Sequence, residues 1–126
     1  MKVLTKEKIH EHIFDEYDHQ NLESDKEYEV IGITHEHYRI VNKRGEPVLY
    51  PKYLFTVIDP SIPENWVCER YAPDEYYIDP PELSKTGFYE DYFDGKAYAI
   101  IIFNHFLEMR TVGEFSHNSS LWFVTI

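Results

Sequence analysis

Residues 27–59, which read EYEVIGITHEHYRIVNKRGEPVLYPKYLFTVID, decide the fold of this 126-residue chain. The segments 28–33 and 37–42 are rich in β-branched and aromatic residues, and their side chains alternate with the period of a strand. Two strands are therefore predicted. The segment between them is short enough for a hairpin, and Gly45 supplies the positive φ that a second hairpin needs before a third strand at 48–50.

Pro51 is expected to end the third strand, because proline has no backbone N–H. Residues 51–55 have the length of one tight helical turn, and 56–58 form a further extended run. This order of hairpins, helical turn and strand resembles the SH3-like small barrels of bacteria. The segment 38–55 is also similar to a YRIVNxxGEPxxYPxxLF segment of small uncharacterised proteins from Gram-positive bacteria, which carry a GFYEDYFDG motif further on, as at 87–95 here.

The resemblance implies an SH3-like antiparallel barrel but no activity, because small barrels of this kind bind peptides, nucleic acids and cell walls alike. The fold class expected is α+β. Residues 1–26 should hold an N-terminal helix and a connection, 27–59 the barrel core, and 60–126 an acidic, aromatic-rich hairpin, a helix and a terminal strand. We expect all three parts to pack as one domain.

The helices follow from apolar spacing. Residues 6–19 predict an amphipathic helix capped by Thr5, with its apolar stripe on the barrel. One or two helical turns in 87–95 should bury Phe88, Tyr92 and Phe93. The apolar run that begins at Ala97 continues to Arg110, which favours a C-terminal helix over a strand. The remaining elements predicted are a β-hairpin around 72–75, a loop at 111–120 that contains a short strand at 112–115, and a terminal strand at 121–126.

The negative charge of the chain is concentrated in one region. The formal net charge is −11, and residues 59–95 hold ten acidic against two basic residues. Such a field repels nucleic acid and anionic membranes, and it favours either a basic protein partner or a simple solvated surface. Neither nucleic acid nor membrane is therefore expected as a partner. The bases of the barrel segment, Arg39, Lys43, Arg44 and Lys52, are offset by four acids, so they make a weak phosphate-binding pattern.

The compartment is predicted from what the sequence lacks. No run approaches the ~18 apolar residues of a membrane helix, and the start of the chain lacks the apolar core of a signal peptide. Cys68 is the single cysteine and agrees with a reducing environment. We expect a cytoplasmic protein.

Candidate metal ligands and nucleophiles are present but weakly supported. His35 and His37 form an H-x-H pair without a clear third ligand, and Cys68 has no motif that would lower its pKa. Nucleotide-loop and nucleophile-elbow motifs are absent from the sequence. We predict no enzyme activity, no metal and no cofactor. A second pattern with the spacing of metal ligands lies on the outside of the predicted N-terminal helix and consists of His12, Glu16 and His19.

Aromatic side chains flanked by acids are typical of binding hot spots, and the carboxylates would select a basic partner. The predicted function is a non-enzymatic protein-binding module, with an acidic inhibitor or immunity-type protein as its concrete form. A mimic of nucleic acid is less favoured because the charge is local. The alternatives are that these aromatics belong to the core, or that a small-ligand-binding protein or small hydrolase has a cleft between barrel and C-terminal helix. The predicted partner-binding residues are Trp66, Tyr71, Tyr76, Tyr77, Tyr89, Glu90, Asp91, Tyr92 and Asp94.

Overall fold

The computed structural model describes residues 1–7 and 21–118, with side chains as far as Arg110. The chain divides into two compact units, Met1–Pro81 (unit 1) and Glu82–Ile126 (unit 2). Within the described residues the strands lie in unit 1 and the two α-helices in unit 2. The predicted α+β class is confirmed, while the packing of all parts as one domain stays a prediction.

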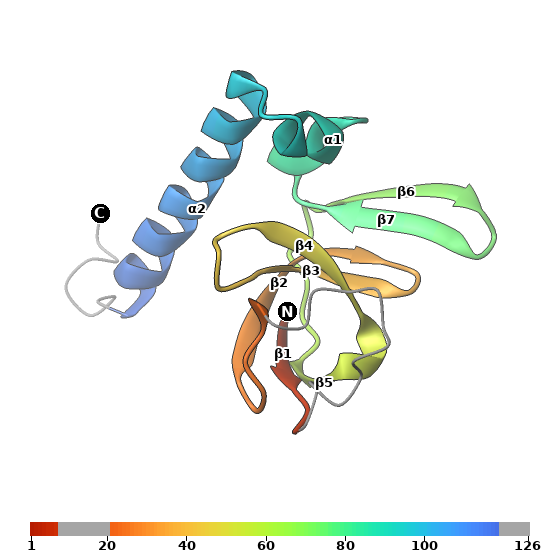
Figure 1. Ribbon diagram of the computed structural model, residues 1–126, viewed down its shortest axis with the longest axis vertical. Coiled ribbons are helices and arrows are strands. Elements are labelled where there is room, and N and C mark those ends of the chain that lie inside the picture. The colour runs from red at the N-terminus through yellow and green to blue at the C-terminus, as the bar shows by residue number, and fades with distance from the viewer. Residues whose placement is uncertain (8–20, 119–126) are drawn as a thin grey trace. The chain divides into compact units, whose positions relative to one another are not determined.

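In the described part of unit 1, seven strands pair in one antiparallel sheet (Figure 1). The main path runs β4-β3-β2-β1-β5, and a hairpin of β6 and β7 joins it where β7 pairs with β2. The strands are β1 (Lys2–Thr5), β2 (Glu27–Thr34), β3 (His37–Val41), β4 (Pro47–Pro51), β5 (Phe55–Asp59), β6 (Val67–Ala72) and β7 (Glu75–Asp79).

The strands predicted in 27–59 are confirmed as β2 to β5, and the helical turn is the 3-10 helix η3 (Lys52–Leu54). In β3 the alternation has the expected effect, since Tyr38 and Ile40 are buried while the residues beside them are half-buried. Gly45 has a φ of 77°, as the β3–β4 turn requires. The local pattern of this segment was therefore sufficient to place its elements.

The sequence did not indicate β1, which lies between β2 and β5. Val3 is paired with Tyr28 on one side and Val57 on the other, and its side chain is fully buried. The strand path of the described residues is open, with β4 and β5 at its ends, so the closed SH3-like barrel is not confirmed. The predicted helix at 6–19 lies, from residue 8 onward, outside the described residues.

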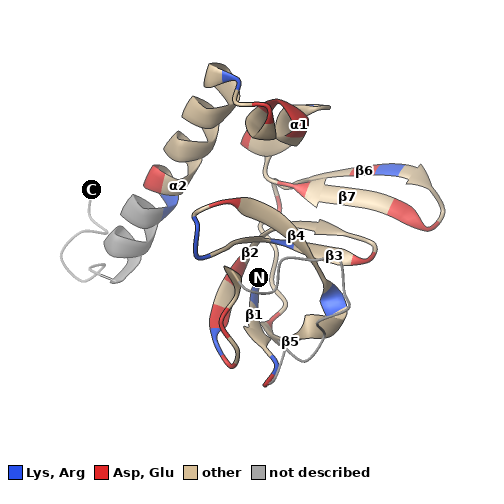
Figure 2. Ribbon diagram, in the orientation of Figure 1, with Lys and Arg blue, Asp and Glu red and all other residues tan. Residues whose placement is uncertain are grey.

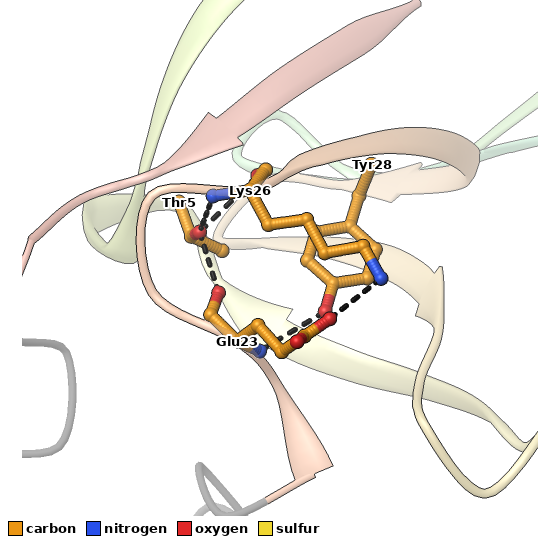
Figure 3. A network of polar contacts seen from close by, with 4 residues as sticks. All are labelled: Thr5, Glu23, Lys26 and Tyr28. Atoms are coloured by element: carbon orange, nitrogen blue, oxygen red, sulfur yellow. Dashed lines mark hydrogen bonds and ion pairs between the residues drawn. The ribbon is translucent and has the colours of Figure 1, made fainter.

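Thr5 ends β1 and ties it to the segment before β2 (Figure 3). Its hydroxyl donates to the carbonyl oxygen of Glu23 at 2.6 Å and accepts from the backbone N–H of Lys26 at 2.8 Å. The phenol oxygen of Tyr28 accepts from the backbone N–H of Glu23 at 3.0 Å. In the described residues the side chain of Thr5 holds this connection. Thr5 was also predicted as a helix N-cap, and the helix that it would cap lies, from residue 8 onward, outside the described residues.

The core of unit 1 gathers side chains from every strand of the main path. Val30, Ile40, Tyr50 and Leu54 are at most 1% exposed. Trp66, Tyr76 and Ile78 are partly buried and pack against this core. One face of the β6–β7 hairpin therefore belongs to the core of unit 1, because the burial of its aromatic and aliphatic side chains stabilises the sheet.

Unit 2 contains two α-helices, α1 (Phe88–Phe93) and α2 (Ala97–Asn118), after a 3-10 turn, η4 (Pro81–Leu83), that spans the boundary between the units. Both predicted helices are confirmed, but α2 runs past Arg110 to Asn118. The loop predicted from residue 111 and the short strand at 112–115 are therefore wrong. One glycine inside a helix costs only about 1 kcal/mol, so Gly113 does not end it. The predicted strand at 121–126 lies outside the described residues.

Aromatic side chains join α1 to α2. Phe88 and Phe103 are buried, and the ring of Tyr92 meets that of Phe103 edge-on at 5.1 Å between centroids. Phe93, expected to be buried, is 51% exposed. The difference arises because so short a helix presents only one narrow face to a neighbour, and Phe88 and Tyr92 occupy it.

Candidate functional site

The β6–β7 hairpin carries three of the predicted binding residues, and Trp66 directly precedes it. The four residues lie on two faces. Its register pairs Glu69 with Tyr77 and Arg70 with Tyr76. Because paired residues in an antiparallel ladder point to the same side, Glu69 and Tyr77 share one face and Arg70 and Tyr76 the other. Figure 1 shows the hairpin projecting from the rest of the sheet.

The outer face is built around two exposed tyrosines. Tyr71 is 60% and Tyr77 42% exposed, and their rings meet edge-on with centroids 5.6 Å apart. Tyr71 lies where the register shifts between Arg70 and Ala72, and a bulge of this kind re-aims the side chain it carries. Its hydroxyl donates to a carboxylate oxygen of Glu69 at 2.6 Å, and this bond raises the pKa of the Tyr71 hydroxyl.

Acidic residues continue this face to the tip of the hairpin. Asp74 and Glu75 are exposed at the turn, and Figure 2 shows acidic positions along the hairpin in red. We call Glu69, Tyr71, Asp74, Glu75 and Tyr77 the acidic hairpin surface. Sequence reasoning did not select Glu69, Asp74 and Glu75 as site residues, although period-two spacing relates Glu69 to Tyr71 and Glu75 to Tyr77.

The other two predicted residues, Trp66 and Tyr76, lie on the inner face of the hairpin and are partly buried. Trp66 and Tyr76 pack against the core of unit 1. The guanidinium of Arg70 lies 5.6 Å from the centre of the Tyr76 ring and donates to the carbonyl oxygen of Pro73 at 2.7 Å. Arg70 thus links the turn of the hairpin, through Pro73, to the Tyr76 ring on the inner face. Tyr76 itself contributes to the stability of unit 1.

Asp79 lies where the hairpin meets β2. Burial raises the pKa of its carboxyl to about 6, and the positive charge of Arg39 opposes that rise. Arg39 itself donates to the carbonyl oxygen of Pro47 at 2.7 Å. A carboxyl with a pKa near 6 in an enzyme is a candidate acid or base. The groups around it are the backbone of Gly32 and the charged side chains of Arg39 and Glu69. Because β7 pairs with β2 at this end of the hairpin, we assign Asp79 to the joint between hairpin and sheet.

The predicted residues of unit 2 lie on or directly after α1. Glu90 and Asp94 are exposed, whereas Tyr89 and Tyr92 are half-buried. Asp91 accepts a hydrogen bond from the hydroxyl of Tyr98, which lowers the pKa of its carboxyl, and it pairs with the ammonium of Lys96 at 3.2 Å. Asp91 therefore stabilises the α1–α2 connection, and Glu90 and Asp94 are the carboxylates of this set that face solvent.

Unit 2 also carries an apolar groove along α2, with a cavity volume of about 590 Å³. Ile101 and Met109 in this groove are 66% and 55% exposed. The sequence could not indicate it, because the run 97–103 is apolar on every helical face and hides which face is covered. The lining residues are Glu82, Ile101, Ile102, His105, Phe106 and Met109.

In the part of the chain that the structure describes, no three side chains of His, Cys, Asp or Glu are grouped so that they could hold a metal ion. No helix of the described residues is long and apolar enough to span a bilayer. Comparison of the chain with models of known protein families, with curated proteins and with solved structures gave no match.

Proposed function

We propose that this protein is a non-enzymatic binding module that contacts a basic protein partner through the acidic hairpin surface. The observation that carries the proposal is the pair of exposed rings of Tyr71 and Tyr77, which meet edge-on beside the Glu69 carboxylate. Tyrosine side chains supply a large contact area with few rotatable bonds, which is why tyrosine is enriched at interface hot spots. The carboxylates around them would attract a basic partner and speed its approach.

In this proposal the protein acts as an acidic inhibitor or immunity-type protein that covers a basic surface of its partner. The local concentration of acidic residues in 59–95 supports this form over a mimic of nucleic acid. The exposed Cys68, which is free, fits a reducing compartment, and we place the action of the protein in the cytoplasm. The α1 residues of the predicted set, and a cleft beside the C-terminal helix, stay predictions.

The proposal also takes β1 to β5 as an SH3-like small barrel. Its support is the strand order β4-β3-β2-β1-β5 together with the 3-10 turn η3 between β4 and β5. The segment predicted as the barrel core then extends to include β1. The likeness concerns the scaffold alone, because function resides in the surface that the scaffold presents.

The test is affinity capture from the native host, with bound proteins quantified by mass spectrometry for three forms of the chain. Tyr71→Ala/Tyr77→Ala removes the edge-on pair of rings. Val57→Ala/Ile58→Ala is the matched control, because both residues are exposed in β5 at 40% and 47%. We expect a basic protein that wild type and control retain and the tyrosine variant loses, and whose retention falls as salt rises. Equal retention by all three forms would refute the proposal.

A further inference from the structure

A second candidate site lies in unit 1, at the β2–β3 loop, and its lining includes the ammonium group of Lys52. A cavity of about 350 Å³ opens where this loop meets the end of β4 and η3, within the lower range of small-ligand pockets. The backbone N–H of Lys52 donates to the carbonyl oxygen of Glu36 at 2.9 Å, which fixes the two walls relative to each other. The cavity, which we call the Lys52 pocket, is lined by His35, Glu36, His37, Pro51, Lys52 and Tyr53.

The ammonium group of Lys52 is held in place by tyrosines. It lies 5.3 Å from the centre of the Tyr38 ring and 5.6 Å from that of Tyr76, and it donates to the Tyr76 hydroxyl at 3.2 Å. Among the described residues no carboxylate lies within 4.0 Å of it, although the chain has 23 acidic residues against 12 basic ones. Aromatic faces stabilise a cation without neutralising it, so the positive charge stays available to a ligand.

Two imidazoles, those of His35 and His37, also line this cavity. The Nδ1 atom of His35 is shielded from solvent and has no hydrogen-bond partner within the described part of the chain. Its ring meets that of Tyr76 edge-on at 6.1 Å. Burial lowers the pKa of His37, the other imidazole. A buried polar nitrogen without a partner is unfavourable, and a ligand oxygen would satisfy it once the ring turns Nδ1, carrying the proton, toward the cavity.

We propose that the Lys52 pocket binds a small oxyanion, the carboxylate or the phosphate-like group of a small ligand, with Lys52 as the charged donor and His35 as an added donor. The exposed Glu36 carboxylate at the rim opposes an anion, but water screens its charge. This site goes beyond the proposed function, since it uses a different surface and a ligand of opposite charge to the basic partner.

The test is a titration of the full ¹⁵N-labelled chain with sulfate and, separately, with acetate, with ionic strength held constant by chloride. We expect saturable shifts of the amide signals of His35, His37 and Lys52 with one or both probes. Sulfate alone would identify a phosphate-like ligand group, acetate alone a carboxylate, and either result supports the site. The absence of saturable shifts with both probes would overturn it.

Three variants make the result specific. Lys52→Met should weaken binding at least about tenfold, because a charge-assisted hydrogen bond is lost. Glu36→Gln should strengthen it about twofold or more, since it removes the opposing charge without touching the core. Lys43→Met is the matched control, because Lys43 is exposed and lies outside the pocket, and it should bind as wild type does. Equal affinity of wild type, Lys52→Met and Glu36→Gln would refute the proposal, even if one variant were less stable.

Discussion

The carboxylate of Asp79 lies directly against the backbone of Gly32, so that a β-carbon placed on Gly32 would be 2.7 Å from Asp79 Oδ1. The same β-carbon would be 3.3 Å from the β-carbon of Arg39. Gly32 is buried in β2, beside a shift in the β2–β3 register, and Asp79 is the last residue of β7. The absence of a side chain at Gly32 is thus what lets the hairpin approach β2 this closely.

We expect Gly32→Ala to destabilise unit 1 by about 2 kcal/mol, because the added methyl overpacks a buried site between two neighbours. Urea unfolding followed by circular dichroism measures the change in the free energy of unfolding. The same substitution in an Asp79→Ala background is the control. There the cost should fall, since Oδ1 is gone. An unchanged cost in that background would show that Asp79 does not restrict the site.

Asp79→Asn should stabilise the protein at neutral pH. The folded-state pKa of about 6 is above the ordinary value near 4. The folded protein therefore binds the proton more tightly than the unfolded chain, and the carboxyl reduces stability as pH rises from about 4 to 6 and by a constant amount above that. We expect a gain of about 2 kcal/mol at pH 7.5, less than the full shift implies because water reaches part of the side chain.

The comparison between wild type and Asp79→Asn isolates this group from carboxyls whose pKa is lowered, such as Asp59, which give the opposite slope with pH. The difference in the free energy of unfolding should nearly vanish at pH 4. A difference of the same size at pH 4 and 7.5 would contradict the raised pKa.

Asn42 organises the β3–β4 turn from a buried position. Its side-chain oxygen accepts from the backbone N–H groups of Arg44 at 2.9 Å and Glu46 at 3.1 Å, and its amide donates to the Tyr50 hydroxyl at 3.1 Å. We expect Asn42→Ala to lower the free energy of unfolding by about 3 kcal/mol, because three hydrogen bonds at a buried position are lost.

Two matched variants serve as comparisons for the loss of stability expected for Asn42→Ala. Tyr50→Phe removes one of the three bonds together with the hydroxyl itself, and should cost about 1 kcal/mol. Lys43→Ala changes an exposed neighbour in the same turn and should stay within about 0.5 kcal/mol of wild type. If all three variants unfolded at the same denaturant midpoint, the prediction that Asn42 stabilises the turn would be wrong.

Thr5 offers a test in which shape and hydrogen bonding are separated. Thr5→Val keeps the shape of a fully buried side chain but removes the bonds to Glu23 and Lys26, and should cost about 2 kcal/mol. Thr5→Ser keeps the hydroxyl and should cost less than Thr5→Val in thermal or urea unfolding. A larger loss for Thr5→Ser than for Thr5→Val would show that packing dominates at this position.

The exposed Lys26–Glu23 ion pair should contribute little to stability, so the free energy of unfolding of Glu23→Gln is expected within about 0.5 kcal/mol of wild type.

The candidate site could be predicted from the sequence only in part. The acidic, tyrosine-rich hairpin around 72–75 was predicted and is confirmed as β6 and β7. Which of its aromatics are exposed was not, because the inner face of Trp66 and Tyr76 is defined by contact with a core built from other strands. The Lys52 pocket could not be predicted either, because the contact between Lys52 and Tyr76 joins residues that are 24 positions apart in the sequence.

The sequence by itself determined β2 to β5, η3, the β6–β7 hairpin, α1 and the start of α2. Each depends on local causes, such as side-chain alternation, a glycine at positive φ, or apolar helical spacing. Tertiary structure alone decided the pairing of β1 between β2 and β5, the open strand path of the described residues, the exposed face of the hairpin and the raised pKa of Asp79. These depend on burial and on partners distant in the chain, and no local pattern records them.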